Sequence, residues 1–375
     1  PPTITGLTPS TGSTAGGQSV TITGTNFIGV SAVTFGGTPA TTFTVDSTTQ
    51  ITATVPPRTA GPADVTVTTV DNTSVTRANG YTYGSTPVVT AVKPVNTPAR
   101  TYAIGASLMF DVDFDQRIAI SNGVPHLKAV LGAVERRMNL IGYGWSTMRF
   151  AYTVVENDLD EDGIAIGSMS LEGATIKDYY HVADADVTLR NIADMSGIRI
   201  DGVRPTVASI KPAGTGTIFD VEFSEPVMAV DIGKFTLVKT GTAQGTIDSV
   251  SGSGSAYQVH VANVSGDGTL ALSLSAGTGI KDIAGNEMAS AFTGGTPMIV
   301  TPPSIDASLS GIGMSNGTLT PAFDAATTSY SLSVANSVTS IAVTPASTHP
   351  GATVSVNGAV VSAPGSVPVS LQVGD

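Results

Sequence analysis

The chain contains no cysteine in its 375 residues, which excludes disulfide bonds, zinc–thiolate sites and cysteine nucleophiles. It also has no apolar run approaching about 18 residues, the length that a membrane-spanning helix needs, so no span is expected. The sequence begins at Pro1 and shows no signal peptide. We therefore expect it to be a mature or excised piece whose export signal has been removed.

Charge is scarce as well. Charged residues make up 12% of the chain, against about 25% in an average soluble domain. The 29 acidic residues outnumber the 17 basic ones and give a net charge of −12. Such a surface repels phosphate backbones and no basic cluster offsets it, so nucleic-acid binding is not expected. The same acidity suits divalent cations and keeps an exposed chain soluble.

The chain is rich in strand patterns. Apolar and polar residues alternate along most of it, and this period of two predicts strands with one buried face. Residues 108–114, 219–223 and 270–274 show the pattern most clearly. The 42 glycines and 22 prolines suit many tight turns, and no long helical pattern is present. The predicted fold class is all-β.

Three turn-rich breaks, at residues 84–87, 202–205 and 301–303, divide the chain into four segments. Their bounds are 1–84, 85–203, 204–301 and 302–375. Each of the first three segments has the length of a β-sandwich with roughly seven strands. Because each linker is short and contains proline, we predict tandem immunoglobulin-like β-sandwiches in an elongated rod that bends little.

The first segment carries a long sequence pattern at residues 2–9, 12, 16–27, 33–37 and 81–83. Within it, Gly16 and Gly17 supply a tight turn before a strand, and Gly24 ends that strand. The pattern resembles the IPT/TIG domain, which has an immunoglobulin-like fold.

The second and third segments share another kind of pattern. It includes the strand at residues 108–114, the stretches 150–154 and 158–164, and the closing phrase at residues 200–207. Segment three has corresponding stretches at residues 221–227 and 279–286. Both segments resemble bacterial Ig-like modules that are strung together in giant surface proteins. Segment two departs from this family at residues 176–181, where it has a different sequence from residues 279–286 of segment three.

The fourth segment resembles the cadherin-like β-sandwich of bacterial surface proteins. The resemblance depends on Leu309, Ser315, Gly317, Leu319, Pro321, Phe323, Thr327, Tyr330 and residues 354–358. The acidic linker motifs of true cadherins are missing, so this resemblance does not imply calcium. The sequence ends at Asp375, before the family's last strands. We therefore expect further residues, or a strand from another chain, to complete a domain with an open edge.

All these resemblances imply spacing, adhesion or self-assembly outside a bacterial cell. The expected protein is therefore non-catalytic and extracellular, at the bacterial cell surface, as a stalk or a subunit of a fibre or layer. Its expected partners are neighbouring copies of itself or adjacent domains of a longer chain. Two alternatives are a module that binds carbohydrate or a host protein, and an accessory region of a secreted polysaccharide-degrading enzyme.

One candidate metal site is formed by Asp158, Asp160 and Asp162. Carboxylates at alternate positions of a loop can converge on one calcium ion, and Gly163 permits the turn. The twelfth position of an EF-hand loop would be Met169 instead of glutamate, so the loop is not an EF-hand. A calcium site in a β-loop, completed by Asn157 or Asp178, is one interpretation. A solvated acidic turn is the favoured one.

A second candidate metal site combines Asp282 and Asn286 with Glu225 at a strand end. These residues suit a calcium ion, although Asp and Asn in such loops more often hydrogen-bond their own backbone. No cofactor is required by the sequence, and calcium is the one that it suggests.

Trp145 is the only tryptophan. It can stack on a sugar ring, but a lone tryptophan in a sandwich is more often a core residue, and we expect core. The four histidines, at positions 126, 181, 260 and 349, lack the spacing of a zinc site. No nucleophile motif is present, so we expect no enzyme.

Overall fold

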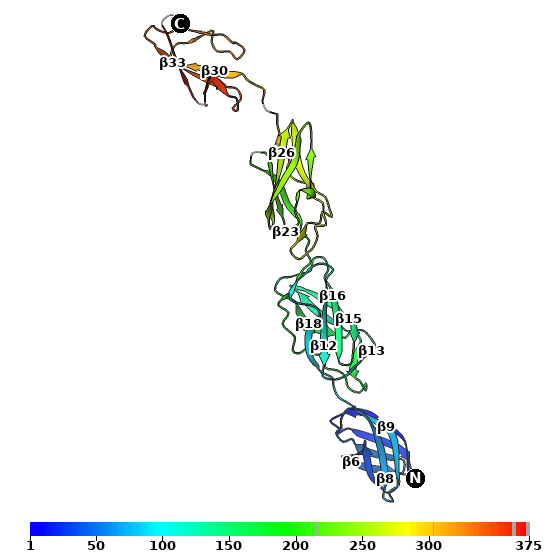
Figure 1. Cartoon of the computed structure of the whole chain (residues 1–375). Helices are drawn as coiled ribbons and strands as arrows, with labels where there is room; N and C mark the ends of the chain where they lie inside the picture. The colour runs from blue at the N-terminus through cyan, green and yellow to red at the C-terminus, as the bar shows by residue number, and fades with distance from the viewer. Residues whose placement is uncertain (215, 303, 362–364, 373–375) are drawn as a thin grey trace.

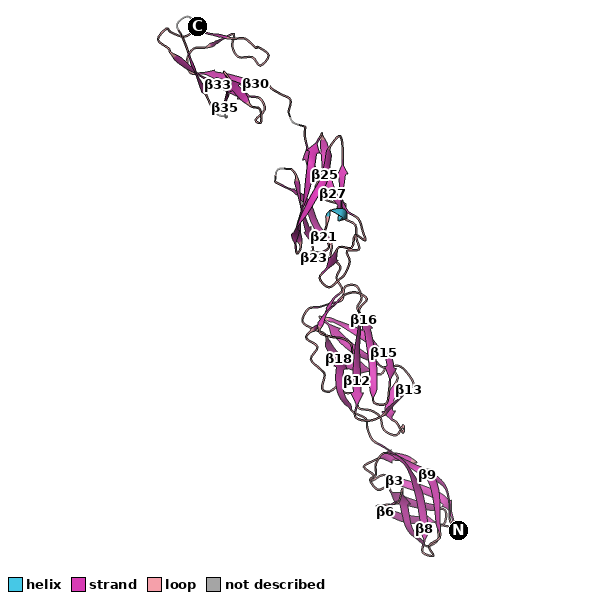
Figure 2. Cartoon of the chain, viewed as in Figure 1, coloured by secondary structure: helices cyan, strands magenta, loops and turns pink. Residues whose placement is uncertain are grey.

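The computed structural model describes residues 1–214, 216–302, 304–361 and 365–372. The all-β prediction is confirmed: the described chain contains 36 strands and one short 3-10 helix, η1 (Ile232–Lys234) (Figure 2). Every sheet is formed by strands from one of the four predicted segments, which we call modules 1 to 4. Pro303, part of the third predicted break, and the last three residues lie outside the described residues.

Module 1 is a sandwich of two sheets, ordered β1-β3-β7-β6 and β2-β9-β8-β4-β5. Its core is filled by alternate residues of these strands, among them Val20, Ile22 and Phe35, together with the edge-to-face pair Tyr81 and Tyr83. The strands are β1 (Thr3–Thr8), β2 (Thr11–Ser13), β3 (Ser19–Thr25), β4 (Val30–Phe35), β5 (Thr38–Pro39), β6 (Thr42–Ser47), β7 (Gln50–Thr54), β8 (Gly61–Thr69) and β9 (Ser74–Gly84).

Module 2 is built around a six-stranded sheet ordered β10-β12-β16-β15-β14-β18, with the smaller sheets β11-β20-β17 and β13-β19. Leu108, Phe110, Val112 and Phe114 are buried on one face of β12, as their alternation predicts. The strands are β10 (Val89–Pro94), β11 (Arg100–Tyr102), β12 (Ser107–Phe114), β13 (Ile118–Ser121), β14 (His126–Leu131), β15 (Val134–Tyr143), β16 (Thr147–Thr153), β17 (Leu159–Asp160), β18 (Ala165–Ser170), β19 (Thr175–Asp178) and β20 (Ile198–Asp201).

Module 3 pairs a four-stranded sheet, β21-β22-β26-β25, with the sheets β24-β27-β29 and β23-β28. Phe219, Val221 and Phe223 of β22 meet Leu270, Leu272 and Leu274 of β27 in its core. The strands are β21 (Val207–Ala213), β22 (Ile218–Phe223), β23 (Val227–Met228), β24 (Phe235–Lys239), β25 (Gln244–Ser253), β26 (Ala256–Ser265), β27 (Gly268–Leu274), β28 (Lys281–Asp282) and β29 (Met298–Val300).

Module 4 has shorter strands and little core. Its sheets are β30-β33-β36, β31-β32 and β34-β35, and Ile341 is the one hydrophobic residue buried in its described part. The strands are β30 (Leu309–Met314), β31 (Leu319–Thr320), β32 (Ser331–Leu332), β33 (Ser340–Ser347), β34 (Val354–Val356), β35 (Ala359–Val361) and β36 (Val367–Ser370).

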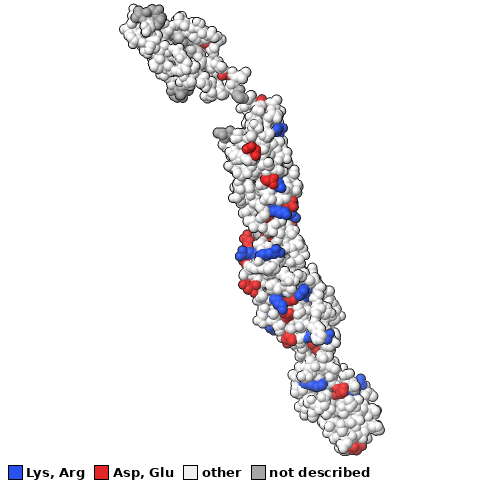
Figure 3. Space-filling view, in the orientation of Figure 1, with Lys and Arg blue, Asp and Glu red and all other residues white. Residues whose placement is uncertain are grey.

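The four modules follow one another in an elongated rod, with the two chain ends at opposite tips (Figure 1). On the face shown in Figure 3, charged side chains gather mainly over modules 2 and 3. Module 4 contains no Lys or Arg. The junction between modules 2 and 3 therefore lies in the most highly charged part of the rod.

Candidate functional site

The junction between modules 2 and 3 is held by the buried side chain of Asn286. Its Oδ1 accepts a hydrogen bond from the backbone N–H of Ile104 in module 2, at 2.8 Å. Its Nδ2 donates to the carbonyl oxygen of Asp201, the last residue of β20, at 2.8 Å and to that of Val203, in the linker, at 3.2 Å. One amide side chain of module 3 thus contacts module 2 and the connecting segment at once.

The linker is also fixed from the side of module 2. The N–H of Gly202 donates to the carbonyl of Asp158 at 2.6 Å, and the N–H of Asn157 donates to the carbonyl of Gly202 at 2.9 Å. The guanidinium of Arg204 donates to the carbonyl of Glu287 in module 3, at 2.8 Å. Backbone and side-chain bonds therefore hold this linker to both of its neighbours.

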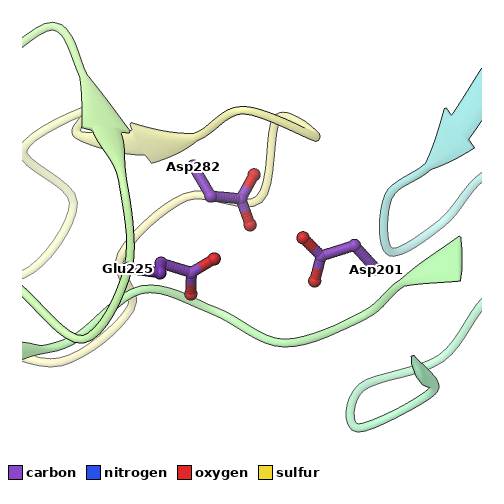
Figure 4. Close-up of side chains that lie close together, drawn as sticks. All are labelled: Asp201, Glu225 and Asp282. Carbon is purple, nitrogen blue, oxygen red and sulfur yellow. The ribbon is translucent and has the colours of Figure 1, made fainter. Parts of the chain in front are cut away.

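Three carboxylates meet at the same junction. Asp201 ends β20, Glu225 lies between β22 and β23, and Asp282 ends β28; each offers an oxygen within 4.8 Å of the other two (Figure 4). The pairing of β23 with β28 brings the loops of Glu225 and Asp282 together. In the described part of the chain, this is the one group of three acidic or histidine residues close enough to share an ion.

Two of these carboxyl groups, Glu225 and Asp201, have raised pKa values. Partial burial raises the pKa of Glu225 to about 7, and the nearby charges of Asp201 and Asp282 add to the shift. Burial, and then repulsion by Asp282 and Glu161, also raise the pKa of Asp201. Asp282 is 1% exposed and its Oδ1 accepts from the N–H groups of Gly285 and Asn286.

Oxygen-rich sites of this kind are those that calcium prefers. Asp201, Glu225 and Asp282 are the residues that could hold such an ion. Asn286 is placed differently from the sequence prediction, because its side-chain oxygen is occupied by the N–H of Ile104. Calcium binding at Asp282 stays a prediction, with Asp201 as the partner that sequence reasoning missed. The one feature of the sequence that could have pointed to Asp201 is its position beside Gly202, in the stretch at residues 200–207 that joins the two modules.

The first candidate metal site is not gathered in the structure: Asp158, Asp160 and Asp162 do not form a group of oxygens within 4.8 Å. The carboxylate of Asp158, 2% exposed, accepts from Arg136 Nε at 2.7 Å, from the N–H of Val155 and from the hydroxyl of Tyr152. Asp160 accepts from the N–H groups of Gly132 and Gly163. Two of the three carboxylates are therefore buried in protein hydrogen bonds, which corrects the favoured interpretation of a solvated turn.

The two residues suggested to complete that site also lie elsewhere. Asn157 is exposed, and its positive φ of 69° forms the turn that receives Gly202. Asp178 is buried, and its carboxylate accepts from the N–H groups of Val182 and Ala183 at 2.7 and 2.6 Å. It therefore shapes the loop after β19.

The expectation that Trp145 is a core residue is wrong. Its side chain is 75% exposed, in the turn between β15 and β16. The core of module 2 is filled by Tyr102, Phe110, Phe114 and Phe150 together with aliphatic and methionine side chains, without a tryptophan.

No helix in the described part of the chain combines the length and apolar character required to cross a membrane.

Family models match two parts of the chain. Residues 2–83 match the IPT/TIG domain, and residues 307–375 match the cadherin-like beta sandwich domain. The predicted resemblances of modules 1 and 4 are thereby confirmed. A search of curated proteins found no match.

Solved structures with some similarity include the plexin A4 extracellular region, at 16% identity and a TM-score of 0.21, covering 72% of this chain and 21% of that one. A structure described with a xylogluco-oligosaccharide has 11% identity and a TM-score of 0.28, covering 85% and 64%. The Escherichia coli adhesin FdeC has 11% identity and a TM-score of 0.30, covering 81% and 97%. The chain thus spans less than two thirds of the first two, and at these scores we infer no function from them.

Proposed function

We propose that this chain is a non-catalytic spacer of an extracellular protein at the bacterial cell surface, holding another part of the assembly at a distance. The observation that carries the proposal is the locked junction between modules 2 and 3. A hinge between two catalytic or ligand-clamping domains requires a linker that can change its backbone conformation. Here, Asn286, Gly202 and Arg204 attach the linker to both modules.

The family matches support the same proposal. The chain carries an IPT/TIG match at one end, residues 2–83, and a cadherin-like beta sandwich match at the other, residues 307–375. In this proposal the role of Asp201, Glu225 and Asp282 is to stabilise the junction between modules 2 and 3. A calcium ion bound by them would join module 2 to module 3, and the spacer needs no other cofactor.

Small-angle X-ray scattering and light scattering on residues 1–375 test this function. We expect an elongated monomer whose modules 2 and 3 keep a fixed separation. A compact particle, or a broad range of separations between these two modules, would contradict a spacer.

A subunit of a fibre or layer is the second candidate, because module 4 buries so little apolar surface. Ile341 is its one buried hydrophobic residue in the described part, so a neighbouring copy has apolar side chains to cover. Negative-stain images of the same sample distinguish the two: end-to-end chains indicate assembly, and separate rods indicate a spacer.

A further inference from the structure

An exposed aromatic groove lies on module 2, away from the carboxylate junction. It has a volume of about 430 Å³ and is lined by Arg117, Tyr143, Trp145, Tyr179 and His181, with residues of β13. Trp145 is 75% exposed, Tyr143 54% and Tyr179 44%. Contiguous exposed apolar patches mark interaction sites or ligand-binding grooves, and three aromatic rings gather in this one.

Arg117 is placed between two of these rings. Its Cζ lies 4.7 Å from the centre of the Trp145 ring and 3.6 Å from the centre of the Tyr179 ring. Throughout the described residues, no hydrogen bond or ion pair involves its guanidinium, although the chain has 29 acidic residues. These two cation–π contacts hold the guanidinium beside the rings and leave its N–H donors free for a ligand.

The groove is also formed in advance. The carbonyl of Trp145 accepts from the N–H of Ile118 at 2.9 Å, and the N–H of Tyr179 donates to the carbonyl of Arg117 at 3.1 Å. The buried carboxylate of Asp178 fixes the loop that carries Tyr179 and His181. Three separate segments are thus joined by backbone bonds, so little ordering is required when a ligand binds.

We propose that this groove binds a sugar residue that carries a carboxylate, with the sugar ring stacked on Trp145 and the carboxylate paired with Arg117. An exposed indole offers a flat apolar surface to the C–H face of a pyranose ring. The planar guanidinium matches a carboxylate with two parallel hydrogen bonds. The volume lies in the range of small-ligand sites, roughly 300–1,000 Å³. This binding is a function beyond that of a spacer.

Isothermal titration calorimetry on the full chain, with matched sugars, tests the proposal. Oligogalacturonate and sialyllactose are each compared with their own methyl ester, so that the two members of each pair differ only in the charge of the carboxylate. We expect at least one acidic member to bind on the order of tenfold more tightly than its neutral partner, which is the effect of losing one charged hydrogen-bonded contact. The pair that responds identifies a uronic or a sialic acid.

The binding affinities of single-residue variants test which side chains contact the sugar. Trp145→Ala removes the stacking surface and should weaken binding of both members of the pair about tenfold or more. Arg117→Gln should lower the affinity for the acidic sugar to that of its neutral partner. Ile283→Ala, at a side chain 74% exposed in module 3, is the matched control and should change nothing. Thermal midpoints of all variants check that each one folds.

Several outcomes would overturn the proposal. Equal affinity for acidic and neutral sugars would contradict the pairing of Arg117 with the carboxylate. If none of the probes binds, the groove is not a sugar-binding site. A fall in molar mass by light scattering on Trp145→Ala, without any sugar binding, would identify the groove as a contact between copies.

Discussion

The two linkers that flank module 3 differ sharply. The linker from module 2 is bonded on both sides, through Asn286, Gly202 and Arg204. In the linker to module 4, Ile305 is fully exposed, and the side-chain hydrogen bonds of Ser304 and Asp306 stay within two residues. Among the described residues other than Gln372, no hydrogen bond or ion pair joins module 3 to module 4. Short proline-containing linkers are thus not equivalent, because stiffness depends on what the linker can bond to.

The largest expected effect comes from Gly202→Ala. An added methyl group would lie 2.4 Å from the carbonyl oxygen of Val155 and 2.8 Å from that of Asp158, both backbone atoms. We expect the free energy of unfolding to fall by about 3 kcal/mol, because the turn must shift to accept the group. Calorimetric melting measures the loss. Gly294→Ala is the control, since open space surrounds a methyl group there, and an equal loss in both variants would contradict the argument.

Asn286→Ala should have the next largest effect. It leaves the partly buried N–H of Ile104 and the carbonyls of Asp201 and Val203 without this partner, at a cost of about 2 kcal/mol. The chain has no cysteine, so pairs of introduced cysteines can carry spin labels specifically. Electron–electron distance measurements should show a narrow distribution between modules 2 and 3 that broadens in the variant. The distribution between modules 3 and 4 should be broad before and after.

The two linkers should also respond oppositely to pH. The pKa of Glu225 is raised from 4.5 to about 7 in the folded protein, so the folded state holds a proton that the unfolded chain has lost. Stability at the first junction should therefore fall as pH rises from about 4.5 to about 7. The hydroxyl and N–H of Ser308 lower the pKa of Asp306 below 3.8, so its contribution is present above that value and is lost as pH falls further. Glu225→Gln should flatten the first slope, and melting curves between pH 3 and pH 8 would show it.

Calcium provides a sharper version of the same test. At pH 7.5, a bound ion would compensate for the three carboxylates and raise the melting midpoint of module 3. Glu225→Gln should reduce that increase. If calcium and a chelator leave both proteins unchanged, the cluster is only a set of mutually repelling acids.

The smallest effect is expected at Ile305. Its side chain is fully exposed, so Ile305→Ser should alter the unfolding free energy by less than about 0.5 kcal/mol. Proteinase K should nonetheless cut the protein first within residues 304–308, and later or not at all at residues 202–206. Early cleavage at the junction of modules 2 and 3 would mean that the two linkers are equally accessible.

Much of the fold followed from local patterns. The alternation at residues 108–114 correctly identified the buried face of β12, because a strand places successive side chains on opposite faces. The expectation that a lone tryptophan lies in the core was wrong for Trp145, because it lies in a turn, where no alternation places a side chain. The solvated turn favoured for Asp158 was also wrong, because its partners Arg136 and Tyr152 come from neighbouring strands.

Local sequence patterns were enough to predict the all-β class and the IPT/TIG and cadherin-like ends, because these depend on strand period, turn residues and long motifs. Only the tertiary structure brought Asp201 to Glu225 and Asp282, joined Asn286 to Ile104, and placed Arg117 between Trp145 and Tyr179. These contacts join residues up to 182 positions apart. No local pattern encodes them, because they depend on how loops from separate strands meet when the modules pack.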